Sequence, residues 1–222
     1  MFIIIRKRVG MIISRARQFM LFPDPLAVAT PIVQALQPWS DTATSDLFFD
    51  AMTPIAAEWA CDAADLAFYG YLRIAVTEHP FTRLARLYDR IAQTDTMWQL
   101  RHMTGIGLPD FNQWLRTTSA DGHGAGGRSS PRWRQHGAWS ARHWESGRIS
   151  HTVRLESIED DLAPVLNDLG IAPAFENLTP AFVERDAWLD RYDQASVDFM
   201  KTQYAWDLAQ FGYAAPRQHK AT

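Results

Sequence analysis

Three consecutive basic residues near the N-terminus stand between an apolar run and an amphipathic one. Residues 2–5 are continuously apolar, which is typical of a strand buried on both faces of a sheet, and the spacing of residues 11–20 predicts a helix. A basic glycine turn between a strand and a helix can bind phosphate through backbone N–H groups, or it can simply be solvated. The residues of this candidate anion-binding turn are Arg6, Lys7, Arg8, Val9, Gly10, Met11 and Ile12.

Further strands alternate with helices along the chain. Residues 71–76 predict a strand that leads into a helix over residues 81–91, and residues 151–155 predict another that leads into a helix over residues 158–169. Additional helices are expected over residues 45–67, 109–115 and 192–210, and a flexible loop over residues 119–131. Because strands and helices alternate without an internal repeat, we expect a single α/β domain over residues 1–222.

The composition limits the classes of function. The formal net charge of −3 gives no overall field that would attract nucleic acid or an anionic membrane, so an anion site must be local. No apolar run near the N-terminus approaches the roughly 20 residues that span a bilayer, and the lone Cys61 cannot form an internal disulfide. We therefore expect a cytoplasmic protein with no membrane span and no nucleic-acid partner.

Two of these segments resemble the donor-binding motifs of the sulfotransferase family, of the type that modifies carbohydrates. The basic turn resembles the 5′-phosphosulfate loop, Ile-Pro-Lys-Thr-x-Gly-Thr-Ser, with matches at Lys7 and Gly10. Residues 76–88 resemble the 3′-phosphate segment, Val-Arg-Asn-Pro-Tyr-x-Arg-Leu-x-Ser-x-Tyr. That segment matches at Pro80, Arg83, Leu84 and Tyr88. Residues 154–162 and 204–213 resemble the family's Phe-Glu-x-Leu strand and its terminal helix, which ends in Phe-Gly-Tyr.

The chain departs from both donor motifs. In the first, Arg6 and Arg8 replace a proline and a threonine, and the final Thr-Ser pair is absent because Met11 and Ile12 stand there. In the second, the arginine, asparagine and serine positions are occupied by Glu78, His79 and Arg86. A carboxylate at the arginine position would repel a phosphate. Arg86 could restore the lost charge from further along the helix.

The resemblance implies a fold, a donor and a reaction. The fold would be a P-loop-like, doubly wound parallel sheet flanked by helices, with a nucleotide at the carboxyl ends of the strands. The donor substrate would be 3′-phosphoadenosine 5′-phosphosulfate, held by residues 6–12 together with Arg83 and Arg86, and the acceptor would be a hydroxyl group, for example on a carbohydrate. Lys7 would stabilise the charge that develops during sulfuryl transfer, and no metal is expected.

Other residues leave alternatives open. Glu58 is the best-placed candidate for the general base, although a solvated helix carboxylate is the simpler interpretation. The aromatic and basic run over residues 132–144 could stack an acceptor or form a packed lid. The histidines in this part of the chain, at positions that match no standard set of metal ligands, are His123, His136 and His143. Two functions remain: a sulfotransferase, or a catalytically weakened relative that keeps the fold and serves as a binding or scaffold protein.

Overall fold

The structure, a computed structural model, describes residues 12–23, 32, 36–39, 42–43, 67–94, 110–116, 140, 149–172 and 188–216. The strand expected over residues 2–5, nearly all of the helix expected over residues 45–67 and the loop expected over residues 119–131 lie outside these ranges. Within them, no helix is long and apolar enough to span a bilayer.

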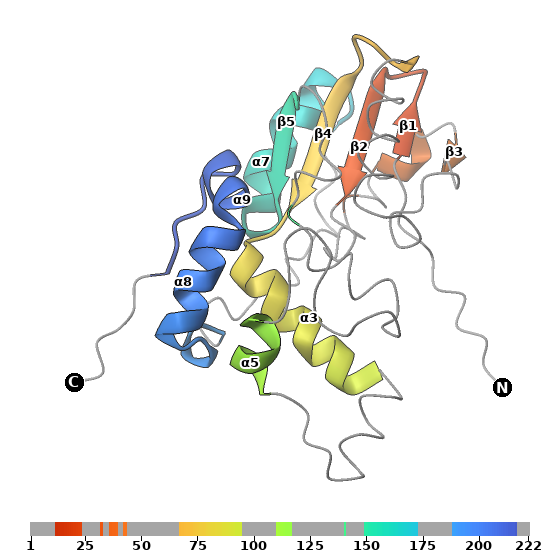
Figure 1. Cartoon of the computed structure of the whole chain (residues 1–222). Coiled ribbons are helices and arrows are strands. Elements are labelled where there is room, and N and C mark those ends of the chain that lie inside the picture. The colour runs from red at the N-terminus through yellow and green to blue at the C-terminus, as the bar shows by residue number, and fades with distance from the viewer. Residues whose placement is uncertain are drawn as a thin grey trace, which may run out of the picture.

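The described strands form one open, mixed sheet with the order β3-β1-β2-β4-β5 (Figure 1). β1 (Ile12–Ser14) pairs antiparallel with β2 (Phe19–Pro23) and with β3 (Thr42–Ala43). β4 (Leu72–Thr77) pairs in parallel with β2 and with β5 (His151–Arg154). Among the described strands, only β1 therefore opposes the others. The expected α/β class is confirmed, but the expectation of a wholly parallel sheet is wrong at β1.

The segment predicted as a helix over residues 11–20 is a β-hairpin in the part that the structure describes. β1 and β2 are joined by a turn over residues 15–18, in which Gln18 has a φ of 53°. Ile13, Phe19 and Met20 recur at helical spacing, yet the turn places them on two paired strands, where all three are buried. The β-branched and aromatic residues on either side of the turn favour strands, and pairing with β3 and β4 satisfies their backbones.

The strand-to-helix connections after β4 and β5 are confirmed. α3 (Pro80–Thr94) follows β4, and α7 (Ile158–Asp168) follows β5 after a short 3-10 turn, η5 (Leu155–Ser157). The single terminal helix that we expected is divided at Tyr204. The remaining described helical elements are η1 (Gln37–Trp39), α5 (Phe111–Arg116), η6 (Leu189–Arg191), α8 (Gln194–Gln203) and α9 (Ala205–Gln210).

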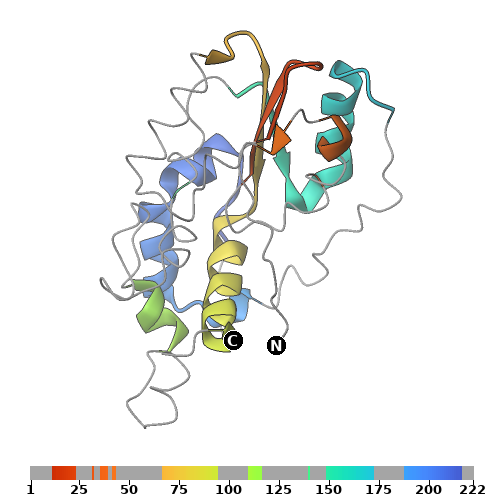
Figure 2. The same cartoon turned by 90° about the vertical axis from the view of Figure 1, so that its right-hand side faces the viewer.

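Helices cover the sheet, and Figure 2 shows α7 on one side of it and α8 with α9 on the other. Alternate strand residues, such as Leu21, Ile74 and Val153, belong to a core cluster that includes the buried face of α7. The intervening residues Met20 and Ala75 have no exposed surface either, so both faces of the sheet are covered. A second cluster lies among α3, α5 and α8.

The hairpin turn holds the C-terminal end of α7. The Arg17 Nη1 group donates to the Leu169 carbonyl oxygen at 3.1 Å, and the Arg17 guanidinium lies 4.6 Å from the centroid of the Trp39 ring. Gly170, which follows the C-cap residue of α7, has a φ of 63°. Arg17 therefore binds one of the carbonyl groups that a helix end leaves without an intrahelical partner.

We expect Arg17→Ala to lower the free energy of unfolding by about 1–2 kcal/mol, because it removes a hydrogen bond to the helix end and a cation–π contact. Arg15→Ala is the matched control, since Arg15 is exposed in the same turn and its guanidinium carbon lies 5.9 Å from the Phe68 ring centroid. Urea denaturation of both variants measures the difference. Equal losses would contradict the proposed role of the Leu169 contact.

Candidate functional site

The carboxyl ends of β2, β4 and β5 lie at one edge of the sheet because these three strands are parallel. Open α/β sheets bind their ligands at this edge. We call the residues that line it at the end of β4 and just beyond β4 and β5, together with a C-terminal tyrosine that contacts them, the carboxyl edge. They are Thr77, Glu78, His79, Glu156 and Tyr213.

Glu78 and Arg86 form an ion pair at this edge. Glu78 directly follows β4, and its Oε2 atom accepts a hydrogen bond from the Nη2 group of Arg86 on α3. The Glu78 side chain has no exposed surface, and the Arg86 side chain is 32% exposed. The charge of Arg86 is thus directed to a carboxylate of the same chain.

Arg83 lies in the interior and contacts the terminal helices. Its guanidinium is 4.0 Å from the carboxylate of Asp207 on α9 and 5.8 Å from the ring centroid of Tyr204. All three side chains are almost completely buried. Arg83 therefore connects the first turn of α3 to the α8–α9 junction.

Arg154 at the end of β5 has a carboxylate partner as well. Its Nε and Nη2 groups donate to the two carboxylate oxygens of Asp161 at 2.8 and 3.0 Å, and its backbone N–H donates to Asp161 at 2.9 Å. Burial alone would raise the pKa of the Asp161 carboxyl, but hydrogen bonds from Arg154 and from the Ser157 hydroxyl hold it below its ordinary value. The pair therefore connects the last residue of β5 to the first turn of α7.

Glu156 joins β4 to the C-terminal segment. Its Oε1 atom accepts from the His79 backbone N–H at 2.7 Å, and its Oε2 atom accepts from the Tyr213 hydroxyl at 3.1 Å. Burial and the neighbouring Glu156 carboxylate raise the pKa of Tyr213 well above its ordinary value, so Tyr213 is a neutral hydrogen-bond donor here. One carboxylate therefore holds segments that are far apart in the sequence.

Both nitrogen atoms of the His79 ring make hydrogen bonds within the protein. Its Nδ1 atom accepts from the Phe81 backbone N–H at 3.3 Å, which leaves the proton on Nε2, 3.1 Å from the Ala214 carbonyl oxygen. The ring also lies 4.7 Å from that of Tyr213, centroid to centroid. In these contacts, His79 connects the start of α3 to the C-terminal segment.

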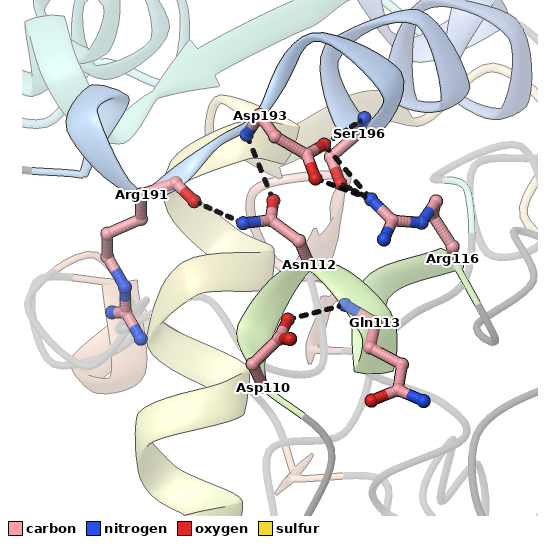
Figure 3. Close-up of polar contacts among 7 residues, drawn as sticks. All are labelled: Asp110, Asn112, Gln113, Arg116, Arg191, Asp193 and Ser196. Atoms are coloured by element: carbon pink, nitrogen blue, oxygen red, sulfur yellow. Dashed lines mark hydrogen bonds and ion pairs between the residues drawn. The ribbon is translucent and has the colours of Figure 1, made fainter.

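A separate polar network positions α5 against α8 (Figure 3). Arg116 donates to the carboxylate of Asp193, the N-cap of α8, at 2.8 and 3.0 Å and to Ser196 Oγ at 2.9 Å. The Asn112 side-chain amide donates to the Arg191 carbonyl oxygen and accepts from the Asp193 backbone N–H. These polar groups form hydrogen bonds between α5 and the start of α8, so we assign them a structural role.

The structure describes only part of the predicted site. Arg83 and Arg86 lie near the carboxyl edge, with the partners given above. Ile12 is the first residue of β1, opposite Leu21 and Ala43, and not part of a turn that enters a helix. The predicted site residues that lie outside the described ranges are Arg6, Lys7, Arg8, Val9, Gly10, Met11 and Glu58.

Sequence reasoning did not assign roles to Glu156, Asp161, Asp207 or Tyr213. Their positions in the sequence could have identified them. Glu156 and Asp161 lie shortly after β5, and Asp207 and Tyr213 lie in and just after the last helix. Within the described residues, no group of three or more histidines, cysteines or acidic residues could hold a metal ion. The contacts described above pair charges inside the protein.

We expect Asp161→Asn to weaken the dependence of stability on acid pH. A carboxyl whose pKa is lower in the folded protein contributes stability above its unfolded pKa of about 4, and this contribution is lost as the pH falls through the folded value. Denaturation at pH 6, 4 and 3 should thus show a smaller loss on acidification in the variant than in the native chain. Asp160→Asn, an exposed neighbour on the same helix, should behave like the native chain.

We expect Asp207→Asn to destabilise the protein by about 3–5 kcal/mol, because it leaves Arg83 as a buried charge that has lost an anionic partner. Asp198→Asn is the control, since Asp198 is an exposed carboxylate on the preceding helix whose pair with Lys201 contributes about 0–1 kcal/mol. Chemical denaturation measures both. A loss below about 1 kcal/mol for Asp207→Asn would contradict the structural role of the pair.

No protein-family model, no curated protein and no solved structure matches this chain.

Proposed function

We propose that the chain is a sulfotransferase-like protein whose donor site is weakened, and that it acts as a binding or scaffold protein in place of a working transferase. One observation carries this proposal. The three arginines found at or beside the carboxyl ends of β4 and β5 in the described residues each have a carboxylate partner within the chain. The pairs are Arg83 with Asp207, Arg86 with Glu78 and Arg154 with Asp161.

Electrostatics disfavours a 3′-phosphate beside Glu78. A phosphate that took Arg86 as its partner would leave the fully buried Glu78 carboxylate with a second negative group as its neighbour. Taking the partner from a buried charge costs up to roughly 3–5 kcal/mol. The partial exposure of Arg86 reduces this cost, and the repulsion between like charges adds to it. The Glu78–Arg86 pair therefore acts against donor binding at the position where the family resemblance would put it.

The sequence after β2 supports the same conclusion. β2 is the parallel neighbour of β4, so the residues that follow it are those expected to face a nucleotide's 5′-phosphate in an open α/β sheet. Residues 24–31 contain no lysine, arginine or glycine. Without a cation or a glycine that allows close backbone approach, such a segment is a poor phosphate-binding loop.

A second candidate is the sulfotransferase itself, with a doubly wound P-loop-like fold, 3′-phosphoadenosine 5′-phosphosulfate as donor and a hydroxyl acceptor. Two observations favour it. β4 leads directly into α3 at Pro80, which keeps the strand–turn–helix order of a 3′-phosphate segment, and about a third of the Arg86 side chain remains exposed. Lys7 and its basic neighbours would supply the 5′ side of that site, with Glu58 as the base.

Calorimetric titration with 3′-phosphoadenosine 5′-phosphate, the desulfated donor, distinguishes the two. We expect no heat below millimolar ligand for the native chain, because the arginines at the edge are already paired. Micromolar binding that Lys7→Ala abolishes would instead establish a working donor site and would overturn the proposed weakening.

We expect Glu78→Gln to raise the affinity for 3′-phosphoadenosine 5′-phosphate by at least about tenfold, or 1.4 kcal/mol, because it removes the carboxylate that competes for Arg86. Glu159→Gln makes the same charge change at an exposed position on α7 and should leave the affinity unchanged. A thermal melt shows that each variant is folded. Equal affinities of the two folded variants would contradict the role given to Glu78.

A further inference from the structure

Residues 212–216, which we call the C-terminal strap, follow α9 and contact the carboxyl edge. Tyr213 contacts Glu156 through its hydroxyl and His79 through its ring, and the Ala214 carbonyl oxygen accepts from the His79 ring. The strap belongs to no helix or strand. Its hold on the edge thus depends on side chains more than on backbone pairing.

The contacts of the strap fall at the ends of β4 and β5. Thr77, the last residue of β4, lies near the Tyr213 hydroxyl, and Glu156, which accepts a hydrogen bond from that hydroxyl, lies two residues beyond β5, in η5. Tyr213 is mostly buried there, whereas Ala214 is exposed. The strap therefore occupies the edge at which a sheet of this kind receives its ligand.

The geometry points to an autoinhibitory role for the strap: docking of Tyr213 on His79 and Glu156 and binding of a phosphate-bearing nucleotide at the carboxyl edge exclude each other. This inference rests on the second candidate under the proposed function, the sulfotransferase, in taking that edge as the nucleotide-binding edge; in the weakened relative the strap would be a further obstacle to the nucleotide. Release of the strap requires the loss of the Tyr213 and Ala214 contacts, while Gly212, with a φ of 68°, supplies a backbone position at which the chain changes direction.

Hydrogen exchange tests the docking without any ligand. The backbone N–H groups of His79, Phe81 and Arg83 are hydrogen-bonded at this edge. In the full chain, Tyr213→Ala, and to a lesser degree Tyr213→Phe, should speed exchange over residues 78–83 by about tenfold and leave α7 unchanged. Thr202→Ala, which removes a hydrogen bond from an exposed residue of α8, is the control. Unchanged exchange, or equal acceleration in α7, would overturn the inference.

Titration with 3′-phosphoadenosine 5′-phosphate tests the exclusion. We expect Tyr213→Ala, made together with Glu78→Gln, to bind this nucleotide at least tenfold more tightly than Glu78→Gln alone. Equal or weaker binding by the double variant would overturn the exclusion, because the strap would then be neutral or part of the site. If neither variant binds while exchange at residues 78–83 is faster in Tyr213→Ala, the strap docks as described and the failure belongs to the proposed ligand edge.

Discussion

A charged side chain in the interior of a protein needs a partner, and this constraint organises the described part of the chain. Desolvating an isolated charge is far more costly than a whole domain's stability would allow. Here Arg83 and Glu78 are both fully buried, and each meets an opposite charge, from α9 in one case and from α3 in the other. The pairs hold the first two turns of α3 against the end of β4 and against the terminal helices. The same pairing gives the described arginines at the sheet edge carboxylate partners, so the architecture and the weakening that we propose for the anion site would share one physical cause.

The periodicity of the sequence was sufficient to predict the helices and strands whose pattern lies within one continuous segment. β4 and α3, and β5 and α7, were predictable because strand-forming residues lead directly into a segment with helical spacing, with a clear boundary such as Pro80 or Gly170. The β1–β2 hairpin was not, because two short strands and the turn over residues 15–18 reproduce the spacing of one amphipathic helix. The pairing of β2 with β4 selects the hairpin over the helix. Because β4 lies far along the chain, the local sequence pattern contains no information about this pairing.

In the candidate site, too, the sequence indicated some residues but not the tertiary contacts that they make. Glu78, Arg83 and Arg86 could be singled out only because residues 76–88 resemble a sulfotransferase motif, and their partners could not be predicted at all. Asp207 reaches Arg83 only because α9 packs beside α3, and Glu78 turns toward Arg86 because the end of β4 is closed to solvent. A residue type at a given spacing indicates which chemistry is available. Burial and tertiary contact decide whether that chemistry faces a ligand or another residue of the protein.

The hydrogen bond from Arg17 to the Leu169 carbonyl oxygen joins positions 152 residues apart, and it has a consequence for how the chain acquires its structure. The hairpin that carries Arg17 is among the first described elements to emerge during synthesis, but β4, β5 and α7 emerge much later. Parallel strands cannot pair until the intervening chain has been closed into a loop, which makes such sheets slow to form. During synthesis the hairpin must therefore wait, with the apolar face of Phe19 and Leu21 uncovered, until most of the protein has been made. Natural chains in this position depend on rapid later collapse, or on chaperones, to avoid association through such exposed strands.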